Sequence, residues 1–211
     1  CCAGAPKTFE AHVKSDHIPV NSCYVTQCFW DVPTFNYTLT IARPYGWVFG
    51  VPLNNRCSIG YLYNENINTL DEVKEDVKNI FEEFNLTPSD TTNAFTFKNY
   101  FRKQNFTERV AFSGNSSFFL EPLEATSIWV QVKALKVLAD KVNRYGIDGE
   151  IGREQFNTAL RQMNEEILNF LHFHYLTQRN DSEFWTTFRT KNESPNLVKN
   201  IFDICKTKMF D

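Results

Sequence analysis

A carboxylate and two hydroxyl side chains stand together in the segment Glu124-Ala125-Thr126-Ser127, immediately before apolar residues at helical spacing. The first backbone N–H groups of a helix have no partner within the helix and lie at the positive end of its dipole. Thr126 and Ser127 can therefore present N–H groups to a phosphate, a carboxylate or a halide ion, with Glu124 close by. The plainer alternative is that one of these hydroxyls only caps the helix.

The residues around this segment help to decide between an anion site and a simple helix cap. A Gly114-Asn115 turn is followed by Glu121-Pro122-Leu123-Glu124-Ala125-Thr126-Ser127-Ile128. This pattern closely resembles the second flavin-contact segment of flavin-dependent halogenases of the tryptophan halogenase type. In that family a Gly-Asn or Gly-Asp turn meets the flavin, and a Glu-Pro-Leu-Glu-Ser-Thr-Gly run follows.

The resemblance implies roles for these residues. Glu124 would be the catalytic carboxylate that polarises the substrate or takes its ring proton, and the amides of Thr126 and Ser127 would bind the halide. The implied FAD contacts are Gly114, Asn115, Pro122, Leu123 and Ile128. The family usually has Ser where Ala125 stands and Gly where Ser127 stands, so a preference among chloride, bromide and iodide does not carry over.

A second segment, Gly46 to Leu53, is similar to the family's Trp-x-Trp-x-Ile-Pro signature. Trp47 and Pro52 match, and Phe49 replaces the second Trp. In the family this segment lies near the flavin and keeps organic substrate away from it. The alternative is a strand with an alternating aromatic core face.

The third match lies in the region from Leu171 to Trp185, whose His-Tyr, Arg, Asp-Ser and Phe-Trp spacing resembles the family's C-terminal part. Phe184 and Trp185 are the substrate-binding candidates that it implies, and ordinary packing is the alternative. His172 and His174 are expected to be structural, since no carboxylate or nucleophile pattern accompanies them.

The activity implied by the resemblance is halogenation of an electron-rich, indole-type aromatic. Reduced FAD (FADH2) would react with O2 to give a flavin peroxide, halide would attack it, and hypohalous acid would travel to the substrate. A separate flavin reductase is implied as partner, since nothing here resembles a nicotinamide site. Two other hypotheses remain open: a related flavin monooxygenase or reductase without halogenation, and a non-catalytic fragment that serves as a binding module.

Composition excludes several other classes. The 211 residues carry a net charge of -3 without a sustained basic run, so nucleic acid is not an expected partner. The chain lacks a stretch of about 18 apolar residues, so no membrane span is expected. The cysteines form no Cys-x-x-Cys pair and no His cluster has zinc spacing, so no metal site is expected. We expect a cytoplasmic protein, a possible homo-oligomer, with reduced thiols at Cys1, Cys2, Cys23, Cys28, Cys57 and Cys205.

The elements that must position these residues indicate an α+β fold: the sheet-rich, substrate-side part of a flavin-monooxygenase-type FAD fold, then a helical C-terminal region. Residues 1–120 are expected to be sheet-rich and 121–211 helical. Alternation and turn residues predict strands at 23–30, 37–42, 47–53, 58–63 and 95–101. Helical spacing predicts a helix at 69–84, with Val73, Val77, Ile80, Phe81 and Phe84 on one stripe, and two more helices after residue 126. The core stripes of these two are Ile128, Val132, Leu135, Ala139 and Val142, then Phe156, Leu160, Met163, Ile167 and Phe170.

One expectation concerns the start of the chain, Cys1-Cys2-Ala3-Gly4, which resembles the end of the family's nucleotide-binding portion. The N-terminal half, with its Gly-x-Gly-x-x-Gly turn and the family's catalytic lysine, is therefore expected to be absent from this sequence. No lysine here stands in a matching context, and none is assigned.

Overall fold

The computed structural model describes residues 4–15 and 17–191, which divide into two compact units. The first unit combines residues 4–18, apart from 16, with 98–174, and the second combines 19–97 with 175–191. The predicted boundary near residue 120 does not coincide with a boundary of either unit, because chain segments distant in sequence pack together in each. The opening Cys1-Cys2-Ala3 lies outside the described residues.

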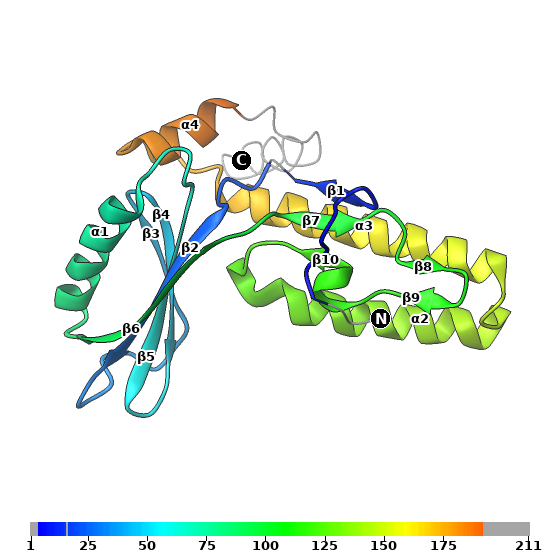
Figure 1. Ribbon diagram of the computed structural model, residues 1–211, viewed down its shortest axis with the longest axis horizontal. Coiled ribbons are helices and arrows are strands. Elements are labelled where there is room, and N and C mark those ends of the chain that lie inside the picture. Colours follow the sequence, from blue (N-terminus) through cyan, green and yellow to red (C-terminus); the bar gives the residue numbers. More distant parts are fainter. Residues whose placement is uncertain (1–3, 16, 192–211) are drawn as a thin grey trace, which may run out of the picture. The chain divides into compact units, whose positions relative to one another are not determined.

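The second unit is built on an antiparallel sheet of strand order β3-β4-β5-β2-β6 (Figure 1). Four strands confirm the predicted ones, with bounds Ser22–Phe29 (β2), Leu39–Arg43 (β3), Gly46–Pro52 (β4) and Arg56–Tyr63 (β5). The predicted strand at 95–101 is instead the end of a longer strand, β6 at Thr87–Thr96, and the separate β7 at Tyr100–Arg102 in the first unit.

Helix α1, Leu70–Glu83, covers one face of this sheet (Figure 1). Its start is fixed by a capping box, in which Thr69 Oγ1 accepts from the Glu72 amide and Glu72 Oε2 accepts from the Thr69 amide. Val73, Val77 and Ile80 form its buried stripe, as predicted. They pack against alternate residues of the central strand: Cys57, Ile59, Tyr61 and Tyr63. A short helix that the sequence did not predict, α4 at Glu183–Lys191, ends the described chain.

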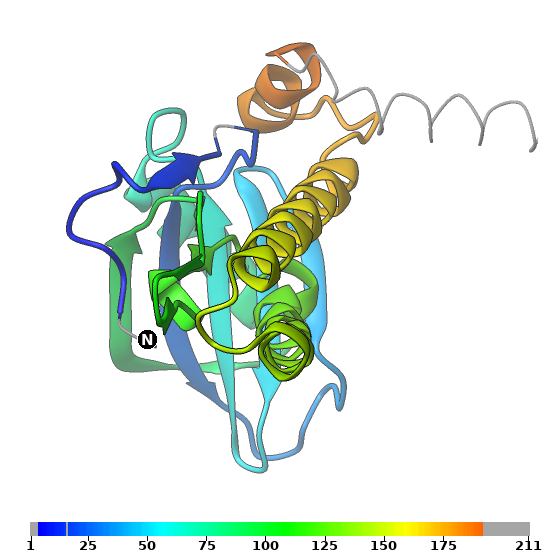
Figure 2. The same cartoon turned by 90° about the vertical axis from the view of Figure 1, so that its right-hand side faces the viewer.

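The first unit is a helical hairpin with small sheets. Helices α2, Thr126–Tyr145, and α3, Glu150–His174, run beside each other (Figure 2). Gly146 follows α2 with a φ of 74°, which fits a glycine at a helix stop. One sheet pairs β1 (His12–Lys14), β7 and β10 (Phe118–Phe119), and another pairs β8 (Phe106–Thr107) with β9 (Val110–Ala111).

The buried face of α2 differs from the predicted one. Ile128, Val132 and Leu135 are 73%, 47% and 56% exposed, whereas Thr126, Val130 and Ala134 are buried. The stripe predicted as core is therefore wrong for α2. In α3 the prediction holds for Phe156, Leu160 and Ile167, which are buried, while Phe170 is 44% exposed.

Within the described residues, no helix has the length and apolar character needed to cross a membrane. The same part of the chain contains no group of three or more His, Cys, Asp or Glu side chains arranged to hold a metal ion.

Candidate functional site

The backbone just before α2 turns through two consecutive left-handed residues. Glu124 has φ 59° and ψ 13°, and Ala125 has φ 50° and ψ 35°. Residues with a Cβ disfavour this region by about 1–2 kcal/mol, and Ala lacks the local hydrogen bonds that make it tolerable for Asn or Asp. Such strain is found at functional sites more often than elsewhere. The turn leaves the Glu124 side chain exposed, beside the first turn of the helix.

The first turn of α2 has the features of an anion site. Ala125 stands at the N-cap position, and its methyl side chain cannot accept a hydrogen bond from the free amides. Those amides therefore keep their capacity for an external acceptor. Thr126 is 8% exposed, and its buried Oγ1 has no hydrogen-bond partner among the described residues. Ser127 is half-buried.

The Gly114-Asn115 turn forms a short 3-10 turn, Gly114–Ser116. Gly114 has a φ of 64°, and a Cβ there would meet no described atom within 4 Å. The turn is anchored by Tyr100, whose hydroxyl donates to the Asn115 carbonyl oxygen at 2.7 Å. Its left-handed glycine and open surroundings fit close approach of a ligand to the backbone.

The first unit thus contains every predicted residue of the flavin and halide group. Leu123 is buried and Pro122 exposed at the short turn before α2, Leu123–Ala125. Ile128 is 73% exposed, and the neighbouring Trp129 is 51% exposed. The uncapped helix start is therefore followed by exposed apolar side chains on the same helix.

The predicted barrier residues lie in the second unit, on strand β4. Trp47 is 5% exposed, its indole N–H donates to the Tyr175 hydroxyl at 3.0 Å, and its ring centroid lies 6.2 Å from that of Phe49. Because side chains alternate along a strand, Trp47 and Phe49 share one face and Pro52 belongs to the other. The three residues therefore do not form one continuous surface of the sheet.

The predicted substrate residues, also in the second unit, are packed against their own chain. Phe184 is fully buried and Trp185 is 4% exposed. The Trp185 indole N–H donates to the Arg43 carbonyl oxygen at 2.8 Å, on the sheet's edge strand, and the Arg179 guanidinium lies over its ring. These contacts protect an edge strand, and the substrate role stays a prediction.

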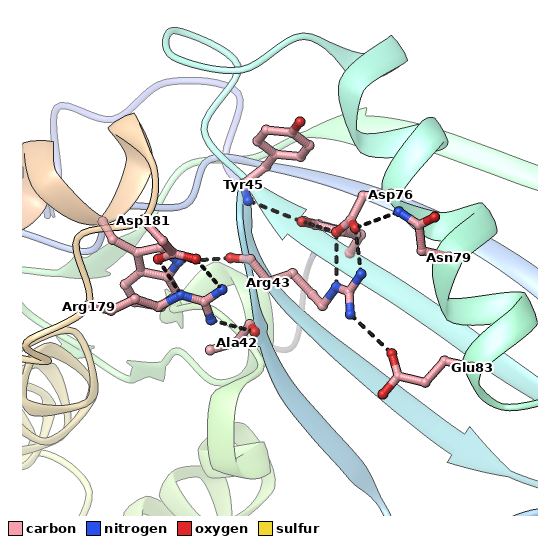
Figure 3. Close-up of polar contacts among 10 residues, drawn as sticks. Ala42, Arg43, Tyr45, Asp76, Asn79, Glu83, Arg179 and Asp181 are labelled. Carbon is pink, nitrogen blue, oxygen red and sulfur yellow. Dashed lines mark hydrogen bonds and ion pairs between the residues drawn. The ribbon is translucent and has the colours of Figure 1, made fainter.

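Sequence reasoning missed a buried ion pair between β3 and α1 (Figure 3). The Arg43 guanidinium donates to both Asp76 oxygens, at 3.0 and 2.5 Å, and the Tyr61 hydroxyl donates to the same carboxylate at 2.9 Å. Burial raises the pKa of Asp76, but hydrogen bonds from Arg43, Tyr61 and Asn79 outweigh it, so that the pKa lies below its usual value. The available signal was a carboxylate at position 76, within the apolar stripe of α1.

The two histidines of α3 follow the structural expectation in part. His172 is fully buried, its Nδ1 lies 3.3 Å from the His17 carbonyl oxygen, and burial lowers its pKa. His174 is half-buried and its Nδ1 lies 2.9 Å from the Phe170 carbonyl oxygen, one helical turn back.

The fold is that of flavin-dependent halogenases. A flavin-dependent halogenase from Xanthomonas campestris matches with a TM-score of 0.80 at 20% identity, over 92% of this chain and 38% of its own. A tryptophan halogenase from Shewanella frigidimarina matches with a TM-score of 0.81 at 18% identity and the same two coverages. At such identities the likeness shows the fold alone.

The sequence shows the family. The model of the tryptophan halogenase family matches residues 7–209, and the chain belongs to that family. Tryptophan 7-halogenase KtzQ of Kutzneria sp. (strain 744) is 29% identical over 71% of this chain and 28% of its own length. Tryptophan 7-halogenase RebH of Lentzea aerocolonigenes is 28% identical over 81% of this chain and 32% of its own. The chain spans about a third of the length of these curated relatives.

Proposed function

We propose that this chain carries the halide site and the catalytic carboxylate of a flavin-dependent halogenase that acts on an electron-rich, indole-type aromatic. The observation that carries the proposal is the start of α2, where the exposed Glu124 stands on a strained turn beside helix amides that the N-cap side chain cannot satisfy. Membership of the tryptophan halogenase family supports the reaction class.

The residues present fit a flavin. A left-handed glycine turn with open space around it accommodates the polar part of such a ligand at Gly114 and Asn115. Exposed Ile128 offers an apolar surface to a flat ring system, beside the helix amides. Pro122 and Leu123 would complete these contacts. Reduced FAD, when bound, supplies together with O2 the oxidising equivalent that converts halide to hypohalous acid.

The chain's own residues would hold the halide and move a proton. A halide needs N–H donors and a positive field, which the Thr126 and Ser127 amides offer at the N-terminus of a helix of 20 residues. Electrophilic attack on an aromatic ring leaves a proton to be removed at the attacked carbon. An exposed carboxylate at Glu124 can accept it, or can polarise the substrate before attack.

The substrate class follows from the relatives' names. The curated relatives include tryptophan 6-halogenases and tryptophan 7-halogenases, which supports an indole ring in the substrate. The reducing equivalents would come from a separate flavin reductase. The proposal leaves open the position of attack on the ring. It also leaves open the preferred halide, because Ala125 and Ser127 stand where the family usually has Ser and Gly.

The test is the substitution Glu124→Gln in the protein that carries this chain. Flavin reoxidation should continue while halogenated product falls by about 100-fold or more, the usual scale for a lost general base. Glu108→Gln is the matched control, because Glu108 is exposed and also has a positive φ, of 48°. Product and consumed flavin are measured together by liquid chromatography.

Two results would contradict the proposal. Unchanged product in Glu124→Gln would remove this carboxylate from the mechanism. Oxygenated product that forms equally well without added chloride, bromide or iodide would favour the related monooxygenase instead.

A further inference from the structure

Two buried cysteines face each other across the central strands of the second unit. In the antiparallel register of β2 and β5, Cys28 is the direct partner of Cys57. Both are free thiols and both are fully buried. Directly opposed residues of antiparallel strands have Cα atoms about 4.5 or 5.5 Å apart, depending on the hydrogen-bonding position. Both values fall within the range of about 4.4–6.8 Å that disulfides span.

The two side chains also share a face of the sheet. Opposed residues of antiparallel strands point to the same side, and both thiols belong to the core beneath α1, with Ile59 and Tyr61. Cys57 contributes to the raised pKa of Cys28, after burial, which places the two sulfur atoms in one another's field. The third described cysteine, Cys23, is opposed by Leu62, and so has no thiol across from it.

We infer that Cys28 and Cys57 are an oxidative modification site, at which a peroxide converts the two thiols into one cross-strand disulfide. One thiolate attacks the O–O bond of hydrogen peroxide, forming a sulfenic acid and releasing hydroxide, which takes up the thiol's proton as water. The second thiol then attacks the sulfenic sulfur, the S–S bond forms and a second water leaves. Two thiols are oxidised, and one peroxide is reduced to two waters.

Peroxide can reach the two cysteines because they lie near the ends of their strands. Only the pair Phe29 and Arg56 lies between these cysteines and the end of the β2–β5 ladder. Phe29 is 44% exposed and Arg56 is also exposed, so opening of the terminal pair uncovers the thiols without unfolding the sheet. A register shift of β2 against β6, between Thr26 and Cys28, weakens pairing on the other side of the same position.

Burial also makes the two thiols slow to react with an oxidant. It raises the pKa of Cys28 to about 12 and that of Cys57 to about 11, so little thiolate exists at neutral pH. Thiolate is the reactive form, and its fraction grows about tenfold per pH unit below the pKa. The disulfide should therefore form faster at pH 9 than at pH 7, by roughly 100-fold over these two pH units.

The experiment treats the 211-residue chain with hydrogen peroxide, alkylates the remaining thiols under denaturing conditions, and maps linked peptides by mass spectrometry. Chymotrypsin cleaves after Tyr24 and Leu53, which separates Cys28 from Cys23 and from Cys57. A linked pair of peptides 25–29 and 54–61 is the expected product. Cys23→Ser should leave this product unchanged, and Cys57→Ser should abolish it.

A folding-dependent readout keeps the inference testable if Cys57→Ser does not fold. Random full pairing of six cysteines allows 15 connectivities, of which about one-fifth contain any given pair. In the native chain, the fraction of molecules with the Cys28–Cys57 link should exceed one-fifth by up to about five-fold. In urea, the same fraction should fall to about one-fifth. Alkylated or sulfonated Cys28 and Cys57 in the oxidised native chain, or links to other cysteines, would overturn the inference.

Discussion

At the scale of single residues, Ala125 is the feature that most departs from what its residue type favours. Its left-handed φ of 50° costs an L-residue about 1–2 kcal/mol, whereas glycine adopts it freely. We expect Ala125→Gly to raise the free energy of unfolding by about 0.5–1 kcal/mol, because relief of strain exceeds the added entropy of the unfolded chain. Urea denaturation measures this change.

The matched control is Ala139→Gly, the same replacement at an exposed position of the right-handed helix α2. There glycine should lower stability by about 0.5–1 kcal/mol. Equal losses in the two variants would mean that the turn before α2 is not strained in solution, and would remove strain from the argument for the proposed halide site.

The resemblance indicated which residues are candidates for the site, but not their backbone conformation. Ser127 and Ala125 were visible as departures from the family's pattern, and the prediction of an anion site followed from the helix start. That two consecutive non-glycine residues turn left-handed could not be read from their types, since Glu and Ala are both strong helix formers. Tertiary packing of Leu123 and Thr126, both buried, overrides that preference.

At the scale of elements, the Arg43 and Asp76 pair connects strand β3 to helix α1. Their side chains are 16% and 7% exposed, so removing one charge leaves the other charge unpaired in the interior. We expect Asp76→Asn to lower the free energy of unfolding at pH 7 by about 3 kcal/mol. Asp71→Asn on the same helix, where the side chain is 96% exposed, should change it by less than about 0.5 kcal/mol.

The pH dependence has a definite sign. The pKa of Asp76 is lower in the folded chain than its ordinary value of 3.8, so the ionised form favours folding. This contribution is complete above the unfolded pKa and is lost as the pH falls through the lowered folded pKa. The gap between wild type and Asp76→Asn should thus be constant from pH 7 to about 5 and narrow below about 4. A gap that stays constant throughout would exclude ionised Asp76 as its cause.

Helix α2 shows why an apolar stripe can be misread. Apolar residues occur on more than one side of this helix, and the stripe with large side chains, Ile128, Val132 and Leu135, is the exposed one. Periodicity identifies an amphipathic helix, but the face that packs depends on the neighbouring helix, here α3. In α1 a single apolar stripe left no such choice, and the prediction was right.

One pair of substitutions tests which face of α2 is buried. Val130→Glu places a charge at a position that is 1% exposed and should destabilise the first unit by more than about 3 kcal/mol. Leu135→Glu, at 56% exposure, should change stability by less than about 0.5 kcal/mol. Thermal unfolding followed by circular dichroism distinguishes them, and the reverse order would restore the face predicted from sequence.

At the scale of the whole molecule, strands and their order along the chain were predictable, and long-range pairing was not. Alternating residues and turn signals placed β2 to β5, but the register that opposes Cys28 to Cys57 depends on the lengths of the connections. The same holds for the two compact units, each of which joins segments from distant parts of the sequence. Local patterns carry no information on which distant segments meet.

The proposed barrier role of Trp47 belongs to this scale, because a barrier is defined by what it separates in the whole protein. We expect Trp47→Ala to lower the ratio of halogenated product to released hydrogen peroxide by about tenfold, which corresponds to about 1.4 kcal/mol between the two outcomes. The physical reason is loss of a large buried ring, held in place by its 3.0 Å hydrogen bond to Tyr175. Chromatography of product and a peroxidase assay give the ratio.

Tyr175→Phe is the control, since it removes the same hydrogen bond, of about 1 kcal/mol, but leaves the indole. The ratio compares two fates of each turnover, so it does not depend on how much of the variant is folded. If Trp47→Ala leaves the ratio unchanged, the indole serves only the packing of β4 against Tyr175. If both variants lower it equally, the orientation of the ring that Tyr175 maintains matters as much as its bulk.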